Sequence, residues 1–320
     1  MKKVRDIFCV LLLLCSTLSC ENWLDVDPKT EIKSELMFQS VSGFKDALMG
    51  VYLTLRDPEL YGKEATWGFV DAIGQQTDIQ DQAAAYYNAS RYNYSQTSGV
   101  SDALWAKAFN AIVNLNNMLE NLDEQQNLFT PATYGVLKGE ALGLRAFLHF
   151  DLVRLFGWGN LAKKPENLEK LCMPYMTKYD KVLTKQLTVG EVLAHIEEDL
   201  LASIELLNNS DPYGLAPKSD DYDLPNEDKF FDNREKRFNY WAAVCTLTRV
   251  YMWMGRKGEA LTLATSFIDK GGRTSWIDSY TIDAYYEKDR DLTFSREHVF
   301  ALDIAELFES VKHYIDPNAN

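Results

Sequence analysis

The stretch from Gly139 to Gly159 constrains the fold more than any other part of the chain, because it predicts a helix with almost no polar side. Apolar residues recur there at steps of three and four, and others cover much of the remaining circumference: Leu137, Ala141, Leu144, Leu148, Leu152 and Leu155, joined by Phe147, Phe150, Val153 and Phe156. Such a helix must be covered by neighbours on several sides. We therefore expect a central helix, ended by Gly157, within a mainly α-helical stack.

Four polar side chains lie on this predicted helix: Arg145, His149, Asp151 and Arg154. They have two interpretations. Buried polar groups are nearly always hydrogen-bonded, so the four would satisfy one another and the nearby backbone. Alternatively, they would take part in catalysis. The apolar surroundings favour the first interpretation.

Further helices are predicted on both sides of the central one. They cover residues 44–56 with Ser42 as N-cap, 103–122 and 188–207. Residues 237–270 predict a helical hairpin in which Leu247, Tyr251 and Ala260 have the spacing of a tetratricopeptide repeat. Long surface loops are expected at 161–185 and 209–236, and a short strand at 299–304.

Composition and motifs exclude several classes of function. The 320-residue chain has a net charge of -14, whereas binding to nucleic acid needs a basic stripe. Neither a phosphate-binding loop nor the H-E-x-x-H zinc motif nor the G-x-S-x-G hydrolase motif is present, and the four histidines are scattered. We expect no metal and no cofactor. A pair of glycosidase carboxylates stays open, because acidic pairs occur throughout the chain.

The N-terminus has the features of a lipoprotein signal peptide spanning residues 1–19. Lys2, Lys3 and Arg5 precede an apolar run that ends shortly before Cys20. This run is shorter than the roughly 20 residues needed to cross a bilayer. Ser19 before Cys20 predicts that Cys20 carries the lipid anchor of diacylglycerol and palmitate. A secreted protein without a lipid is the alternative.

A tract between residues 67 and 98 combines aromatic rings with amides and carboxylates. Flat aromatic faces stack on sugar rings, while amides and carboxylates bind hydroxyl groups. The alternative is a polar loop whose tyrosines pack against helices. Under the first interpretation the candidate ligand-binding residues are Trp67, Asp71, Asp78, Tyr86 and Tyr87.

Three segments in order, 20–28, 105–157 and 237–268, resemble the SusD/RagB family of nutrient-uptake outer-membrane lipoproteins. The resemblance is carried by Leu-Asp-Val-Asp-Pro after Cys20, by Leu-Arg-Ala-Phe at 144–147 and by Phe-Asp-Leu-Val-Arg-Leu-Phe-Gly at 150–157. Glu-His-Val-Phe at 297–300 is similar to a further family motif, with His298 in place of asparagine.

The resemblance implies a SusD-like helical domain over residues 20–320, lipid-anchored and exposed at the cell outer membrane. It implies a non-enzymatic protein that binds an oligosaccharide, a polysaccharide or a peptide. It also implies a SusC-like, TonB-dependent transporter as partner, to which the ligand is delivered. The family continues well beyond the point matching Ile304, whereas sixteen residues follow here, so we expect a chain lacking the C-terminal half. A glycan-cleaving lipoprotein and a helical scaffold that binds no ligand are the alternatives.

Overall fold

The computed structural model describes residues 34–76, 78–270, 282, 294–305, 307–308 and 311–312. The short helix α2 (Ser34–Met37) belongs to a unit of residues 1–37, and residues 38–320 form a second compact unit. The expected signal peptide and Cys20 lie outside the described residues. No helix among the described residues combines the length and the apolar character needed to span a bilayer.

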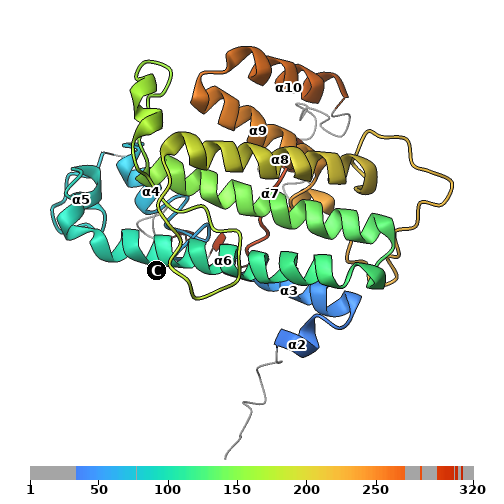
Figure 1. The fold of residues 1–320 in the computed structure, drawn as a ribbon. Helices are drawn as coiled ribbons and strands as arrows, with labels where there is room; N and C mark the ends of the chain where they lie inside the picture. The colour runs from blue at the N-terminus through green and yellow to red at the C-terminus, as the bar shows by residue number, and fades with distance from the viewer. Residues whose placement is uncertain are drawn as a thin grey trace, which may run out of the picture. The chain divides into compact units, whose positions relative to one another are not determined.

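Six longer helices pack in chain order and form the body of the second unit (Figure 1). Each contacts the next: α3 (Val41–Leu55), α6 (Ser98–Glu124), α7 (Pro131–Phe156), α8 (Val189–Ser210), α9 (Tyr240–Met254) and α10 (Lys257–Lys270). No strand occurs in the described part of the chain, where antiparallel pairing is limited to a bridge between Leu171 and Thr188. The prediction of a mainly α, tetratricopeptide-like stack is confirmed.

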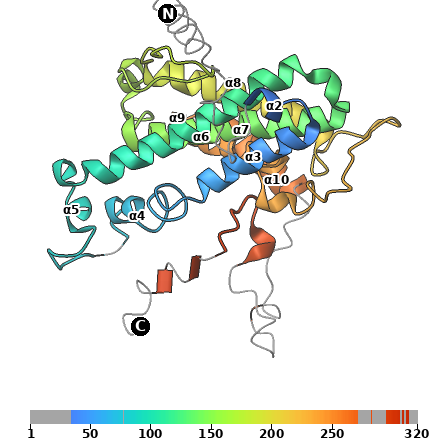
Figure 2. The same ribbon diagram turned by 90° about the horizontal axis from the view of Figure 1, so that it is seen from below.

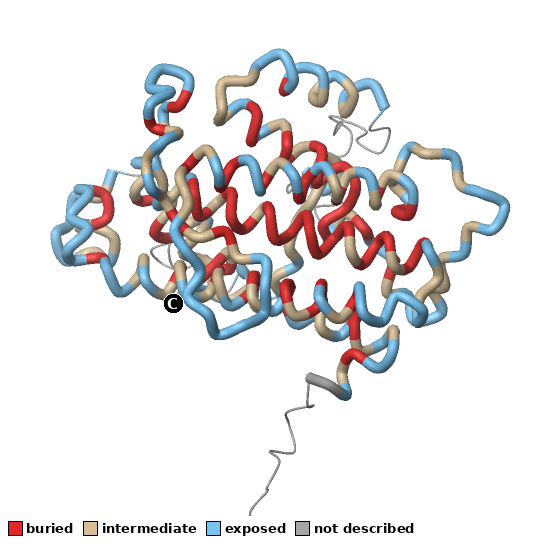
Figure 3. The backbone as a smooth tube through the Cα atoms, in the orientation of Figure 1, coloured by how far each residue is buried: buried red, intermediate tan, exposed pale blue. Residues whose placement is uncertain are grey.

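Helix α7 occupies the centre of the stack, and buried residues occur around its whole circumference (Figure 3). A stripe of glycines lets α8 approach it closely. A Cβ atom on Gly139 would lie 2.8 Å from Leu207, and one on Gly143 would lie 2.7 Å from Ser203 Oγ, both on α8; the Gly143 atom would also lie 2.1 Å from the Phe238 ring, just before α9. Ser203 donates a 2.6 Å hydrogen bond to the Gly139 carbonyl across this contact. Small residues are therefore as necessary to this helix as its leucines.

The helix ends show the local chemistry that starts and stops them. Thr188 and Glu191 form a capping box at the start of α8. The prediction of Ser42 as N-cap of α3 is wrong, because Ser40 accepts the hydrogen bond from the Gly43 amide. The apolar periodicity begins at Phe44 and so did not include Val41, Ser42 and Gly43, with which the helix starts. Gly157 ends α7 in an extended conformation, where a Cβ atom would lie 2.6 Å from the Val153 carbonyl oxygen.

The predicted strand at 299–304 is also wrong. These residues follow the short helix η7 (Ser295–Glu297) without regular structure. The Asn239 side chain donates to the Val299 carbonyl, and the Ala301 amide donates to the Glu235 carbonyl. The Phe300 ring packs edge-on against aromatic rings of the stack. This segment is therefore held by hydrogen bonds to Glu235 and to Asn239, the N-cap of α9, and by aromatic packing, rather than by pairing with a neighbouring strand.

The segment 209–236 contains an exposed loop, as predicted, but it also contains an arginine whose side chain is buried in the core. Arg234, in helix η5 (Arg234–Lys236), donates to Glu140 at 2.6 Å and to Asp211 at 2.6 Å. Arg237 and Tyr52 also donate to Glu140, at 2.8 and 2.5 Å. Burial alone would raise the pKa of Glu140, but the two guanidinium groups hold it below its ordinary value.

Candidate ligand-binding site

The polar and aromatic tract folds into a small subdomain at one end of the stack. Figures 1 and 2 both place helices α4 (Phe69–Ile73) and α5 (Tyr87–Ser90) there, beside the N-terminal end of α6. Phe69, Ala72 and Ala89 form a local apolar core, and Tyr86 packs against it. Two helices of this length do not hold themselves together in water. The shared apolar core therefore positions the polar residues around it.

Trp67 and Tyr86 lie around a single ammonium group. The Lys63 Nζ atom is 5.8 Å from the Trp67 ring centroid and 5.5 Å from that of Tyr86. The Trp67 indole donates to the Gly62 carbonyl at 3.1 Å, and the Tyr86 hydroxyl lies 2.9 Å from a Glu64 carboxylate oxygen. Burial raises the pKa of Tyr86 to about 12, so this hydroxyl stays protonated at neutral pH.

Tyr87 and Asp78 form a second group around Arg91. The guanidinium carbon lies 5.5 Å from the Tyr87 ring centroid, and an Arg91 nitrogen lies 3.8 Å from Asp78. Arg91 also donates to the Ile79 carbonyl at 3.1 Å, which ties the loop before α5 to the segment after it. Asp71 joins neither group. It is half-buried in the first turn of α4, and no side-chain hydrogen bond or ion pair holds it within the described residues.

The predicted residues of the tract differ in how far they are buried, and their role in ligand binding stays a prediction. Tyr86 packs on the local core, as the loop interpretation requires, whereas Asp78 is exposed. The most exposed rings of the tract belong to Tyr92 and Tyr94, at 51% and 55%, with centroids 6.2 Å apart. Neither was among the predicted site residues. Two tyrosines flanking one asparagine, in a polar run, are the sequence signal that could have identified them.

A cavity of about 310 Å³ opens beside Trp67. One wall comes from α3, α7 and the turn before α4, and the other from the segment after η7. The lining is mostly apolar and aromatic: Leu55, Tyr61, Thr66, Trp67, Phe147, Phe300, Leu302, Ile304 and Leu307. Sequence periodicity could not reveal this cavity, because its walls are far apart in the chain.

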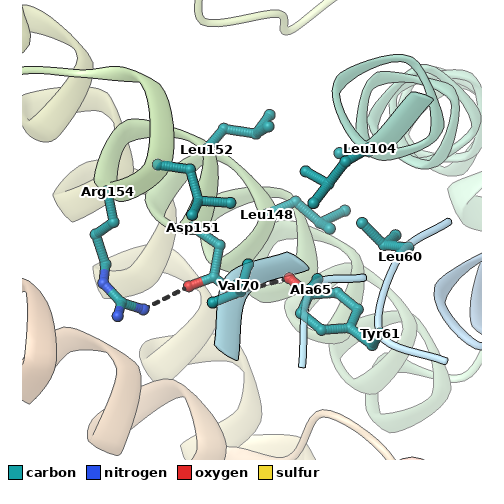
Figure 4. A pocket seen from close by; sticks show the side chains of 11 residues that line it. Leu60, Tyr61, Ala65, Val70, Leu104, Leu148, Asp151, Leu152 and Arg154 are labelled. Carbon is teal, nitrogen blue, oxygen red and sulfur yellow. Dashed lines mark hydrogen bonds and ion pairs between the residues drawn. The ribbon is translucent and has the colours of Figure 1, made fainter. Parts of the chain in front are cut away.

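Asp151 and Arg154 of the central helix lie at a different kind of site (Figure 4). The cavity beside Asp151 measures only about 60 Å³, which is room for a few water molecules and not for a sugar ring. Asp151 accepts hydrogen bonds from Tyr61 at 2.8 Å and from Arg154 at 3.0 Å, and Arg249 lies at 3.5 Å. Its charge is therefore already balanced by protein groups.

Arg145 and His149 are satisfied in the same way. Arg145 forms a two-pronged pair with Asp199, at 2.7 and 2.8 Å, and donates to Asn116 at 3.0 Å. The His149 Nε2 atom accepts from the Met176 amide, so Nδ1 carries the proton and donates to the Arg145 carbonyl at 2.8 Å. Burial lowers the pKa of His149 to about 3. The prediction that these residues satisfy one another and the nearby backbone is confirmed.

Other catalytic chemistry has little support in the described residues. They contain no cluster of three or more histidine, cysteine, aspartate or glutamate side chains arranged to hold a metal ion. The thiols of Cys172 and Cys245 are free, and burial raises the pKa of each to about 11. At neutral pH they are protonated and are therefore poor nucleophiles.

Comparison with known proteins assigns the family. Residues 22–219, more than half of the chain, match the SusD-like family model described as "Starch-binding associating with outer membrane". The protein belongs to the SusD-like family. Two SusD-like proteins of Formosa agariphila are 27% identical to it over 190 and 210 residues. These matches cover 57% and 62% of the SusD-like chain described here but 36% and 37% of the relatives. The chain thus spans little more than a third of their length.

Solved structures agree on the fold. A putative sugar binding protein from Bacteroides vulgatus superposes with a TM-score of 0.59 at 24% identity, covering 82% of this SusD-like chain and 54% of its own. A SusD superfamily protein from Bacteroides thetaiotaomicron gives 0.61 at 17% identity, covering 86% and 58%. Identities this low show a shared SusD-like architecture alone. The resemblance predicted from the signature helix is confirmed.

Proposed function

We propose that this SusD-like protein binds glycan at the outer membrane without cleaving it, and passes it to a SusC-like, TonB-dependent transporter. The observation that carries the proposal is the family match over residues 22–219, whose description names both starch binding and the outer membrane. The sugar-binding description of the Bacteroides vulgatus neighbour supports the same ligand class. In this proposal residues 1–19 are removed as a signal peptide, Cys20 carries the lipid, and residues 20–320 form the helical domain with its hairpin at 237–270.

We place the glycan site in the α4–α5 subdomain, with Trp67, Asp71, Asp78, Tyr86 and Tyr87 as the predicted residues. The Lys63 and Arg91 groups supply aromatic faces beside hydrogen-bond donors, which is the combination that a sugar ring and its hydroxyl groups require. The cavity beside Trp67 extends the aromatic surface. Tyr92 and Tyr94 add exposed rings, so we include both in the site.

Calorimetry with a panel of polysaccharides tests the site. We expect Trp67→Ala to weaken binding by about threefold to tenfold, the usual contribution of one stacked aromatic ring. The Tyr86→Ala/Tyr87→Ala pair should also weaken it. Tyr86→Phe separates binding from packing, because it keeps the ring on the local core and removes only the hydroxyl that contacts Glu64.

Tyr222→Ala is the matched control. Tyr222 is half-buried and belongs to the loop after α8. That loop lies at the opposite end of the stack from α5 (Figure 1). Equal affinity in the parent, Trp67→Ala and the tyrosine pair, with unchanged circular dichroism, would place the site elsewhere. Release of reducing ends from a bound polysaccharide, lost on changing a single carboxylate, would contradict the non-catalytic assignment. Normal glycan uptake by cells that lack the protein would contradict the transport role.

A further inference from the structure

The loop of residues 176–186, between the short helix η4 (Pro165–Glu169) and α8, exposes aliphatic side chains to an unusual degree. Residues 177–186 are all exposed. Leu183 is 98% exposed and its neighbour Val182 is 73% exposed. Isolated apolar residues on a surface are ordinary, but two adjacent aliphatic residues at a loop tip expose area whose burial would be favourable.

The same loop is positively charged in an acidic protein. It carries Lys178, Lys181 and Lys185 against the single acidic residue Asp180, which gives 3 - 1 = +2, whereas the whole chain has a net charge of -14. Neither Lys178 nor Lys181 takes part in an ion pair in the part of the chain that the structure describes. These ammonium groups are therefore available to an anionic partner.

The base of the loop is fixed to the stack, so the tip keeps a defined position. Asn116 on α6 donates to the Met176 carbonyl at 3.0 Å, and Glu120 on α6 accepts from the Tyr179 amide at 2.9 Å. The Cys172 amide donates to the Leu187 carbonyl at 2.9 Å and the Leu187 amide donates to the Met173 carbonyl at 3.1 Å, and these two bonds close the loop at its neck. The segment passes across α6 in Figure 1, and Figure 3 shows it as an exposed stretch. Residues 180–185 form the tip that these bonds hold away from the core.

We propose that the 176–186 loop is a membrane contact, whose tip enters the headgroup region of an anionic lipid surface. Val182 and Leu183 would leave water for the boundary of the acyl chains, Tyr179 would lie at that boundary, and the three lysines would reach lipid phosphates. Each lysine near an anionic surface strengthens attachment. A protein partner fits less well, because lysine is depleted at protein interfaces. This contact goes beyond the proposed function and does not require glycan binding.

Vesicle co-sedimentation tests the contact. The protein is produced from residue 21, so that the expected leader and Cys20 contribute nothing, while the compact unit of residues 38–320 stays whole. Vesicles consist of phosphatidylcholine alone or of phosphatidylcholine with phosphatidylglycerol. We expect binding to the anionic vesicles that weakens as salt is raised.

Two sets of variants separate the apolar and ionic parts of the contact. Val182→Ser with Leu183→Ser should reduce binding by roughly tenfold or more. Each of Lys178→Gln, Lys181→Gln and Lys185→Gln should reduce it by about fivefold at low salt. The control, Leu261→Ser with Lys257→Gln, changes exposed residues of α10 and should bind like the parent. All variants lie on exposed positions, so their melting temperatures should match that of the parent.

The binding of these variants distinguishes a membrane contact from its alternatives. Loss of binding in the loop variants with normal binding by the α10 control supports it. Equal binding of parent and loop variants would overturn it, and so would equal losses in the loop and α10 variants. Failure of the parent to bind either vesicle at low salt would also overturn it, in favour of a protein surface as the occupant of the loop.

Discussion

The Arg234 Nη1 atom lies 2.6 Å from the Glu140 Oε2 atom, although the two residues are 94 positions apart in the chain. Arg237 and Tyr52 complete the shell around this carboxylate. The cluster joins α3, α7 and the segment before α9. A buried ion pair contributes little compared with an apolar replacement, but removing one partner leaves an uncompensated charge. The position of the 230–238 segment therefore depends on Glu140, which pairs with both arginines, and on Asp211, which also pairs with Arg234.

Glu140→Leu should destabilise the protein by about 3–5 kcal/mol, because Arg234 and Arg237 lose their shared counter-charge inside the core. Chemical denaturation measures this change in the free energy of unfolding. Tyr52→Phe is the graded control. It removes the hydrogen bond from the Tyr52 hydroxyl to the Glu140 carboxylate, and also the hydroxyl oxygen that accepts from the Phe238 amide. We expect this change to lower the free energy of unfolding by about 1.5–3 kcal/mol. A Glu140→Leu variant as stable as the parent would contradict this account of the cluster.

Gly143→Ala should lower the melting temperature clearly, because its methyl group would overlap the Phe238 ring and approach Ser203 Oγ at 2.7 Å. Overpacking of this kind costs about 1–3 kcal/mol. Gly50→Ala is the matched control, since a Cβ atom there meets nothing within 4 Å and the residue lies inside α3. That change should stabilise the protein by about 0.5–1 kcal/mol. The same sign for both substitutions would argue against close contact between α7 and α8.

His149 should make stability fall as the pH drops below neutral. Its pKa is about 3 in the folded protein, because burial disfavours the charged ring, and about 6.5 in an unfolded chain. Between these values the unfolded state binds a proton that the folded state does not. The contribution of His149 to the free energy of unfolding is complete above pH ~6.5, and it falls by up to about 1.4 kcal/mol per pH unit below that pH.

Denaturation curves between pH 7.5 and pH 5 measure this dependence, with the window set by the two pKa values above. His149→Gln should flatten the pH dependence even if it lowers stability throughout. His195→Gln serves as control, because His195 lies on the outer part of α8 and its ring is more accessible. An unchanged slope in His149→Gln would show that the protonation of other groups causes the pH dependence.

Cys20→Ala should release the protein from membranes, because we expect the lipid on Cys20 to provide the stable attachment. Detergent phase separation of cell extracts measures this, with the parent expected in the detergent phase. A wash at high salt removes the ionic part of any contact through the 176–186 loop. Persistence of Cys20→Ala in the detergent phase after that wash would contradict lipidation at this residue.

The main helices could be predicted from the sequence because each depends on local periodicity. The α7 pattern of apolar residues and the spacing of Leu247, Tyr251 and Ala260 both depend on neighbours within a few turns. The boundaries were less accurate. α3 begins at Val41 rather than Phe44. Ser42 and Gly43 interrupt the apolar pattern in the first turn, and the cap, Ser40, is identified only by the hydrogen bond that it accepts.

The arrangement of the site could not be predicted in the same way. Trp67 and Tyr86 are brought together around Lys63. Tyr87 and Asp78 are brought together around Arg91. Both groupings depend on how α4 packs on α5. The burial of Arg234 was also missed, because a charged residue in a polar segment normally predicts a solvated loop. Its partners, Glu140 and Asp211, are distant in sequence, so no spacing rule connects them.

The order of packing in the stack has a consequence for how the protein opens. α7 is covered on several sides, whereas α10 is held mainly through α9, and a chain of helices with mostly nearest-neighbour contacts behaves as a nearly one-dimensional system. Local opening then requires the least free energy at the outer end. Amide hydrogens should exchange with solvent fastest in α10, more slowly in α9 and slowest in α7, so the stack would open from its outer end toward its centre.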